Sequence, residues 1–206
     1  MSFVKKNILF VFLFFIINVQ INYAQKAIQP QLLLKNTEGE QEEYSFYSFE
    51  KNTLSLYTIN QNSEYSKLWE YKFLAQKEAE PISVLYGDIK GDVNQELVVL
   101  LYAFGTQSQL YVFSLLNGIP FGEPEIHPLP IEKTGTRPTK AAPFNWDKQQ
   151  KKEILISFNS PERQLVVLDY YNKEFKKATT LASDFMSSTY GPINFFITDT
   201  NQDTVD

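Results

Sequence analysis

A short polar loop followed by an apolar, β-branched run recurs along this chain of 206 residues. Residues 88–99 read DIKGDVNQELVV, and residues 145–156 read NWDKQQKKEILI. A third loop, DTNQD, begins at Asp199 and is cut short by the last residue of the sequence. The loops begin 57 and 54 residues apart. Self-similarity close to the roughly 20 to 50 residues of known repeat proteins indicates stacked or radial structural units.

Extrapolation towards the N-terminus places a fourth copy of the loop at Lys35, 53 residues before Asp88. Glu43 follows Lys35 after eight residues, at the place that Glu96 occupies relative to Asp88. This copy has lost most of its acids, so its assignment rests on position alone.

The segments around the loops alternate aromatic and β-branched residues and are separated by turn residues, a pattern that predicts strands. The predicted strands are residues 31–34, 43–49, 53–59 and 67–74 in the first unit, 82–86, 96–104 and 109–116 in the second, 140–144, 153–158, 163–170 and 174–180 in the third, and 193–198 at the start of a fourth.

Four-stranded sheets repeated about every 55 residues are typical of propeller blades. We therefore predict an all-β fold, a partial β-propeller of four-stranded blades with about three blades and the start of a fourth. Its units begin near residues 31, 82, 140 and 193. A β-sandwich or an open solenoid stays an alternative, because strand spacing alone does not separate these architectures.

The length of the chain bears on this prediction. A closed ring of four to eight such blades needs roughly 220 to 440 residues. The sequence is therefore expected to be an N-terminal fragment, truncated at its C-terminus, or to be completed by a partner.

The first 24 residues read as a secretory signal peptide. Lys5 and Lys6 form a positive start, an apolar run covers residues 8–17, and Ala24 supplies a small-residue exit before Gln25. The apolar run is shorter than the roughly 20 residues of a membrane-spanning helix. We expect cleavage, a mature repeat region over residues 25–206 with no transmembrane segment, and a secreted or envelope-associated location outside the cytoplasm.

Composition excludes several classes of function. The chain has no cysteine, so disulfides, thiolate metal sites and lipidation at a processed cysteine are excluded. Its net charge is −5, and loss of the two lysines with residues 1–24 makes it −7. An acidic chain is a poor partner for nucleic acid, whose phosphates require clustered Lys and Arg.

The stretch 87–99 resembles the FG-GAP and VCBS-type repeat, whose pattern is Asp-x-Asx-x-Asp-x-x-x-Asp followed by an apolar strand. This resemblance extends over the chain from about residue 30 and implies blades similar to those of the integrin alpha head. It also implies calcium in the loops, since Ca²⁺ takes six to eight oxygen ligands. The ligand positions of the family fall on Asp88, Lys90, Asp92 and Glu96, with the Asn94 carbonyl between them, on Asn145, Asp147, Gln149 and Glu153, and on Asp199, Asn201 and Asp203.

An alternative for these loops is a metal-free turn in which Asx side chains cap backbone amides. Lys90 places an ammonium where a ligand oxygen is required, and this ammonium could neutralise Asp88, Asp92 and Glu96 in place of a metal. The loop at Asp199 has suitable oxygens at its first, third and fifth positions.

No catalytic constellation is recognisable. The single histidine, His127, lies in residues 124–130, which we interpret as an extended, proline-rich connection. The lysine cluster at 173–177 is interpreted as a solvated hairpin. Aromatic residues that could stack on sugars, or alternatively pack between blades, are Trp69, Trp146, Tyr44, Tyr57 and Tyr170.

These features predict a binding or adhesion module rather than an enzyme, with a protein or glycan ligand. Two alternatives stay open. The blades could be the non-catalytic N-terminal part of a larger secreted enzyme that acts on polysaccharide, or a structural module of a secretion or envelope complex.

Overall fold

The structure, a computed structural model, describes residues 32–36, 43–50, 52–59, 64–73, 79–103, 107–130, 137–145, 151–158, 164–183, 195 and 197. These residues form twelve strands and no helix, so the all-β prediction is confirmed. The predicted signal peptide lies outside the described residues. In the part of the chain that is described, no helix has the length and apolar character needed to cross a membrane.

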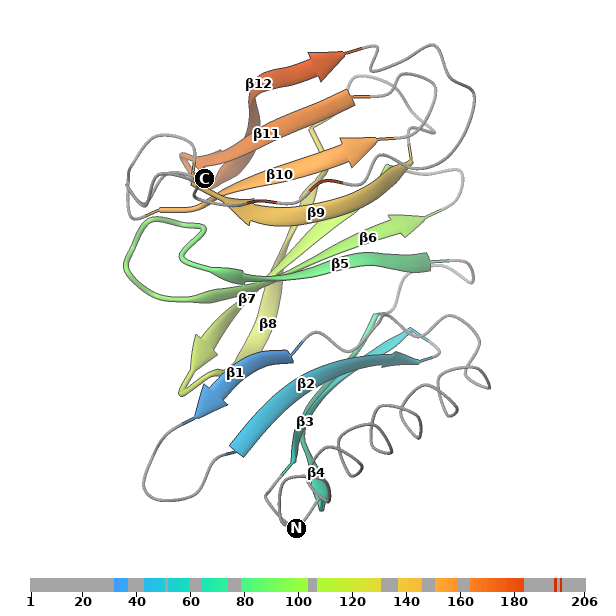
Figure 1. Cartoon of the computed structure of the whole chain (residues 1–206), viewed down its shortest axis with the longest axis vertical. Helices are drawn as coiled ribbons and strands as arrows, with labels where there is room; N and C mark the ends of the chain where they lie inside the picture. The colour runs from blue at the N-terminus through green and yellow to red at the C-terminus, as the bar shows by residue number, and fades with distance from the viewer. Residues whose placement is uncertain are drawn as a thin grey trace, which may run out of the picture.

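The twelve strands form three antiparallel sheets of four strands, each following the order of the chain. Figure 1 shows these sheets arranged one after another along the long axis of the molecule. Sheet 1 contains β1 (Leu32–Asn36), β2 (Glu43–Glu50), β3 (Thr53–Ile59) and β4 (Tyr65–Lys72); sheet 2 contains β5 (Ala79–Gly87), β6 (Glu96–Ala103), β7 (Gln109–Leu116) and β8 (Ile119–Pro128); sheet 3 contains β9 (Pro138–Phe144), β10 (Glu153–Phe158), β11 (Gln164–Tyr171) and β12 (Glu174–Ser183).

The interpretation of residues 124–130 as a connection is wrong for most of that segment. Residues up to Pro128 belong to β8, which pairs with β7 and lies at an edge of sheet 2. Proline is tolerated on an edge strand, where its missing N–H removes no hydrogen bond from the ladder. The edge position therefore explains why proline hid this strand in the sequence.

The loop extrapolated to Lys35 is misplaced by two residues. Asn36 pairs with Glu43 as Gly87 pairs with Glu96, so Lys35 still belongs to β1 and pairs with Tyr44. The equivalent of Asp88 is therefore residue 37, and the connection to β2 is two residues shorter than the eight-residue loop of sheet 2. A nine-position ligand pattern does not fit this shorter connection.

Sheet 2 is buried on both faces. Along β6, Leu97 and Val99 pack in the core shared with sheet 1, and Val98 and Leu100 pack in the core shared with sheet 3. Strand residues alternate between the two faces of a sheet. When other sheets pack on both faces, the strand is therefore apolar throughout. The continuous apolar run after Glu96 is the sequence signature of this position.

The same alternation continues into sheet 3. Ile154 and Ile156 of β10 face sheet 2, whereas Leu155 faces away and packs in a small cluster with Phe195 and Ile197. These last two residues belong to the segment predicted as the start of a fourth unit. The described part of that segment therefore already lies against the far face of sheet 3.

The aromatic residues proposed for sugar stacking are divided between several environments. Trp69 packs edge-on against Phe113, with ring centroids 5.3 Å apart, between sheets 1 and 2. Tyr170 is buried in the core between sheets 2 and 3. Tyr57 stacks on Phe46 at 5.4 Å in sheet 1. Trp146 and the side chain of Tyr44 are outside the described structure.

Replacement of Phe113 by alanine tests the packing of sheet 1 on sheet 2. The Phe113 side chain is fully buried and contacts both Trp69 and Tyr71. We expect Phe113→Ala to lower the free energy of unfolding by about 3 to 5 kcal/mol in denaturant titrations. The exposed Phe121 is the matched control, and Phe121→Ala should change it by less than about 0.5 kcal/mol. Equal losses in the two variants would contradict the observed packing.

Candidate functional site

The loop between β5 and β6, residues 88–95, is organised by its own first carboxylate. Asp88 is only 8% exposed, and its Oδ1 accepts hydrogen bonds from the amides of Gly91 at 2.7 Å and Asp92 at 3.2 Å. Its Oδ2 accepts a third, from the Val93 amide at 3.0 Å. The amides of this loop have no partner strand, and the Asp88 carboxylate supplies the acceptor for three of them.

Glu96 closes the same loop from its other end. This residue is 1% exposed, and its Oε2 accepts the amides of Ile89 at 2.9 Å and Lys90 at 3.2 Å. Burial raises the pKa of Glu96, and the hydrogen bonds from these two amides oppose that rise. The spacing of nine positions from Asp88 to Glu96 therefore serves, in this loop, to bring two carboxylates onto five backbone amides.

The remaining predicted ligands of this loop do not converge with Asp88 and Glu96. Asp92 is exposed and accepts the amide of Asn94 at 3.0 Å, an Asx turn within the loop. Among the described residues, no group of three or more His, Cys, Asp or Glu side chains is arranged to hold a metal ion. The geometry supports the amide-capped alternative at Asp88, and calcium in this loop stays a prediction.

The Lys90 ammonium donates not to the loop carboxylates but to Glu125 Oε1 at 2.6 Å, across to strand β8. Its charge still acts on the loop, because it opposes the rise in the pKa of Glu96. The alternative of a lysine substituting for metal assumed that the nearest acids in sequence are the nearest in space. Packing of the loop over β8 supplies a closer acid.

The second loop repeats the buried ends of the first. Asn145 and Glu153 are both buried, at the positions equivalent to Asp88 and Glu96. The end of the second loop is bonded to the start of the first, because the Lys152 amide donates to the Asp88 carbonyl at 2.7 Å. Asp147 and Gln149, and the third-loop residues Asp199, Asn201 and Asp203, lie outside the described residues, so their predicted role as ligands is untested.

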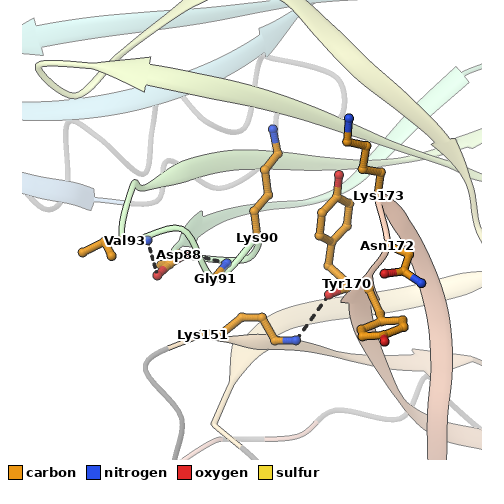
Figure 2. A pocket seen from close by; sticks show the side chains of 9 residues that line it. Asp88, Lys90, Gly91, Val93, Lys151, Tyr170, Asn172 and Lys173 are labelled. Atoms are coloured by element: carbon orange, nitrogen blue, oxygen red, sulfur yellow. Dashed lines mark hydrogen bonds between the residues drawn. The ribbon is translucent and has the colours of Figure 1, made fainter.

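A pocket of about 600 Å³ opens beside these loops, at the interface between sheets 2 and 3, which we call the seam. Figure 2 shows the side chains that surround it. They come from the first loop, from Lys151 at the end of the second loop, from the end of β11 and from the β11–β12 turn. We call this the seam pocket; its lining residues are Asp88, Lys90, Gly91, Val93, Lys151, Tyr170, Tyr171, Asn172 and Lys173.

Glu125 connects the sheets beside this pocket. Besides Lys90, it accepts a hydrogen bond from Tyr170 Oη at 3.0 Å, and its Oε2 lies 3.4 Å from His127 Nε2. Burial acts to raise the pKa of Glu125, but the hydrogen bonds from Lys90 and Tyr170 outweigh it, and the pKa is lowered. Burial, followed by the adjacent Glu125, raises the pKa of Tyr170 to about 12, so the phenol stays a donor.

Lys151 forms the opposite wall of the pocket. Its ammonium is paired with Asp169 and also donates to the Tyr170 carbonyl at 3.3 Å. Its aliphatic stem runs so close to Gly91 that an added Cβ would lie 2.9 Å from a stem carbon. Gly91 also has φ of 76°, so two independent constraints favour glycine there.

Sequence reasoning missed most of this second cluster. Glu125 was hidden in the proline-rich strand, and Tyr170 was considered only as an aromatic surface. Lys173 was predicted to lie in a solvated hairpin and does lie exposed in the β11–β12 turn, but its place in the wall of the pocket was not predicted. The φ values of 52° and 64° at Asn172 and Lys173 show a tight hairpin turn, which the Asn-Lys pair indicated, but its position over the loops of sheet 2 had no local signal.

Glu96→Gln tests the role of the buried carboxylate. Because the folded-state pKa lies above its ordinary value near 4.5, the folded protein binds the proton more tightly. The Glu96 contribution to stability therefore falls as pH rises from about 4 towards 7. Glutamine keeps an oxygen for the two amides and carries no charge, so we expect Glu96→Gln to gain stability relative to wild type across this range.

The measurement is the difference in free energy of unfolding between Glu96→Gln and wild type at each pH. Contributions from Glu125 and other groups are common to both proteins and cancel in this difference. Glu174→Gln, at an exposed glutamate of β12, is the matched control and should show no such trend. A pH-independent difference for Glu96→Gln, or one that shrinks as pH rises, would contradict this role.

Comparison of the chain with protein-family models, with curated proteins and with solved structures finds no match in any of the three. The resemblance of residues 87–99 to FG-GAP and VCBS-type repeats therefore stays a prediction that rests on those residues.

Proposed function

We propose that this chain consists of blades of an exported β-propeller that acts as a binding or adhesion module. The observation that carries the proposal is the series of three four-stranded antiparallel sheets, in which the middle sheet is packed on both faces. Blades of a propeller pack on two neighbours in this way, whereas each sheet of a two-layer sandwich packs on one. The apolar cluster of sheet 3 with Phe195 and Ile197 supports continuation of the series.

The arrangement of the loops supports ligand binding at one end of the blades. The loops that leave the first strand of sheets 2 and 3 are hydrogen-bonded to each other, and the seam pocket opens beside them. Loops on a rigid sheet scaffold are common positions for binding residues. The ligand we propose is a protein or a glycan outside the cytoplasm.

Calcium is proposed as a stabilising ion in some loops, foremost in the loop at Asp199. Asp199, Asn201 and Asp203 offer three oxygen-bearing side chains at alternate positions, a donor set that suits this hard cation. The loop at Asp88 supports calcium less well, because Lys90 takes one ligand position and backbone amides occupy Asp88 and Glu96.

The two other hypotheses predict different observations. As part of a larger secreted enzyme, the blades would be joined to a catalytic region in the same gene. As a structural module of an envelope complex, they would copurify with defined partners and bind no glycan. The seam pocket favours a module that binds a ligand.

Export and binding test the proposed function together. We expect the chain, expressed with residues 1–24 in a bacterial host, to be recovered outside the cytoplasm with Gln25 as its first residue by mass spectrometry. The recovered protein should bind at least one member of a panel of immobilised polysaccharides and matrix proteins. Retention in the cytoplasm, or export without binding to any member, would contradict the proposal.

Thermal melts of the full chain test the calcium proposal. We expect a higher Tm in millimolar Ca²⁺ than in chelator, because an ion bound only by the folded state stabilises it by mass action. Asp203→Ala should reduce this difference. Asp92→Ala is the matched control in the loop that carries Lys90, and it should leave most of the difference intact. Identical melts with and without calcium would show that the loops are metal-free turns.

A further inference from the structure

The seam pocket carries one inference beyond general ligand binding. From its size, its balanced polar groups and its exposed rim, we infer that it binds a neutral sugar unit of a polysaccharide. This inference rests on the proposed binding function and assigns a place and a ligand class to it. The volume of about 600 Å³ lies within the roughly 300 to 1,000 Å³ of small-molecule sites.

The charges around the pocket are balanced. Three lysines line it, and they are matched by the lining Asp88 and by the partners Glu125 and Asp169. A strongly charged ligand would have to displace Glu125 from Lys90 or Asp169 from Lys151, so it gains little from these two ammonium groups. A polyhydroxyl ligand can instead donate to carboxylates and accept from ammonium groups without breaking the balance.

The polar groups are held in place before any ligand arrives. Lys90 and Tyr170 both donate to Glu125, at 2.6 and 3.0 Å, and Lys151 donates to the Tyr170 carbonyl. The wall formed by Asn172 and Lys173 is a tight turn with fixed backbone angles. Pre-organised donors and acceptors reduce the entropy lost on binding.

The rim offers the apolar surface that the C–H faces of a sugar ring require. Tyr171 lines the pocket and is 58% exposed. Lys176 lies over its ring, with Nζ 5.6 Å from the ring centroid, and so restrains the side chain. An aromatic ring with a polar end offers both a flat contact surface and a hydrogen-bonding group.

The backbone conformation of Val93 is independent evidence that the loop at residues 88–95 shapes this rim. Its φ of 74° is in the left-handed region, which is costly for a β-branched residue. Its side chain is 77% exposed, so the conformation gains no core burial in return. The Asp88 carboxylate holds the Val93 amide at 3.0 Å and thereby maintains this conformation beside the pocket. Strain held without a packing benefit is typical of functional positions.

The test is titration of the full chain with three neutral oligosaccharides, cellohexaose, xylohexaose and mannohexaose, and with the anionic hexagalacturonate, followed by calorimetry. We expect at least one neutral oligosaccharide to bind, and to bind about tenfold or more tightly than hexagalacturonate. Tyr171→Ala should weaken this binding by about fivefold or more, and Tyr171→Phe by less than about twofold, because the ring supplies the contact.

Tyr65→Ala is the matched control for these variants. Tyr65 is a 71% exposed tyrosine on β4 of sheet 1, so its removal should leave sugar affinity unchanged. Val93→Gly should raise the Tm, because glycine adopts positive φ without strain, while sugar binding becomes weaker. Loss of affinity in a more stable protein separates a role in binding from a role in folding.

Three results would overturn the inference: no binding of any neutral oligosaccharide, tightest binding of hexagalacturonate, or equal effects of Tyr171→Ala and Tyr65→Ala. These failures are distinct from failure of the proposed function. A chain that is exported and binds a member of the panel equally well after Tyr171→Ala would keep its function as a module and lose only this site.

Discussion

Burial of sheet 2 on both faces is the constraint on which the rest of the structure depends. Leu97, Val98, Val99 and Leu100 of β6 are all fully buried, alternately against sheet 1 and sheet 3. Each such side chain contributes roughly 1.5 to 3 kcal/mol when it leaves water. A four-stranded sheet alone would expose all four, and a sheet with one neighbour would still expose two, so the unit is stable only in a series.

The seam between sheets 2 and 3 shows what such a series can build. Lys90 comes from a loop of sheet 2, Glu125 from its edge strand, and Tyr170 from sheet 3. They form one hydrogen-bonded group only because the apolar faces behind them are packed. The packed core holds the polar groups at the rim of this interface in position. A pocket can therefore form between two sheets without a separate ligand-binding domain.

How far the sequence predicted this arrangement depended on the range of the interaction. Period-two alternation and turn residues predicted eleven of the twelve strands found in the described part of the chain, because both act within a few residues. Strand β8 was missed since its prolines are unfavourable in a strand and are tolerated only at an edge, which is a property of the sheet. The loop at Lys35 was displaced because extrapolation assumed a constant period, whereas pairing of Asn36 with Glu43 set a shorter connection.

The sequence by itself determined the strand-forming segments, the repeating unit and the position of the carboxylates Glu96 and Glu153 at the ends of two loops, where both are buried. Asp88 and Glu96 contact amides within eight residues, and such local bonds follow from spacing. Only the tertiary structure decided the partner of Lys90, 35 residues away, and that of Tyr170, 45 residues away from Glu125. The physical reason is that these contacts are selected by how two apolar faces pack, and no local pattern records which polar side chains that packing brings together.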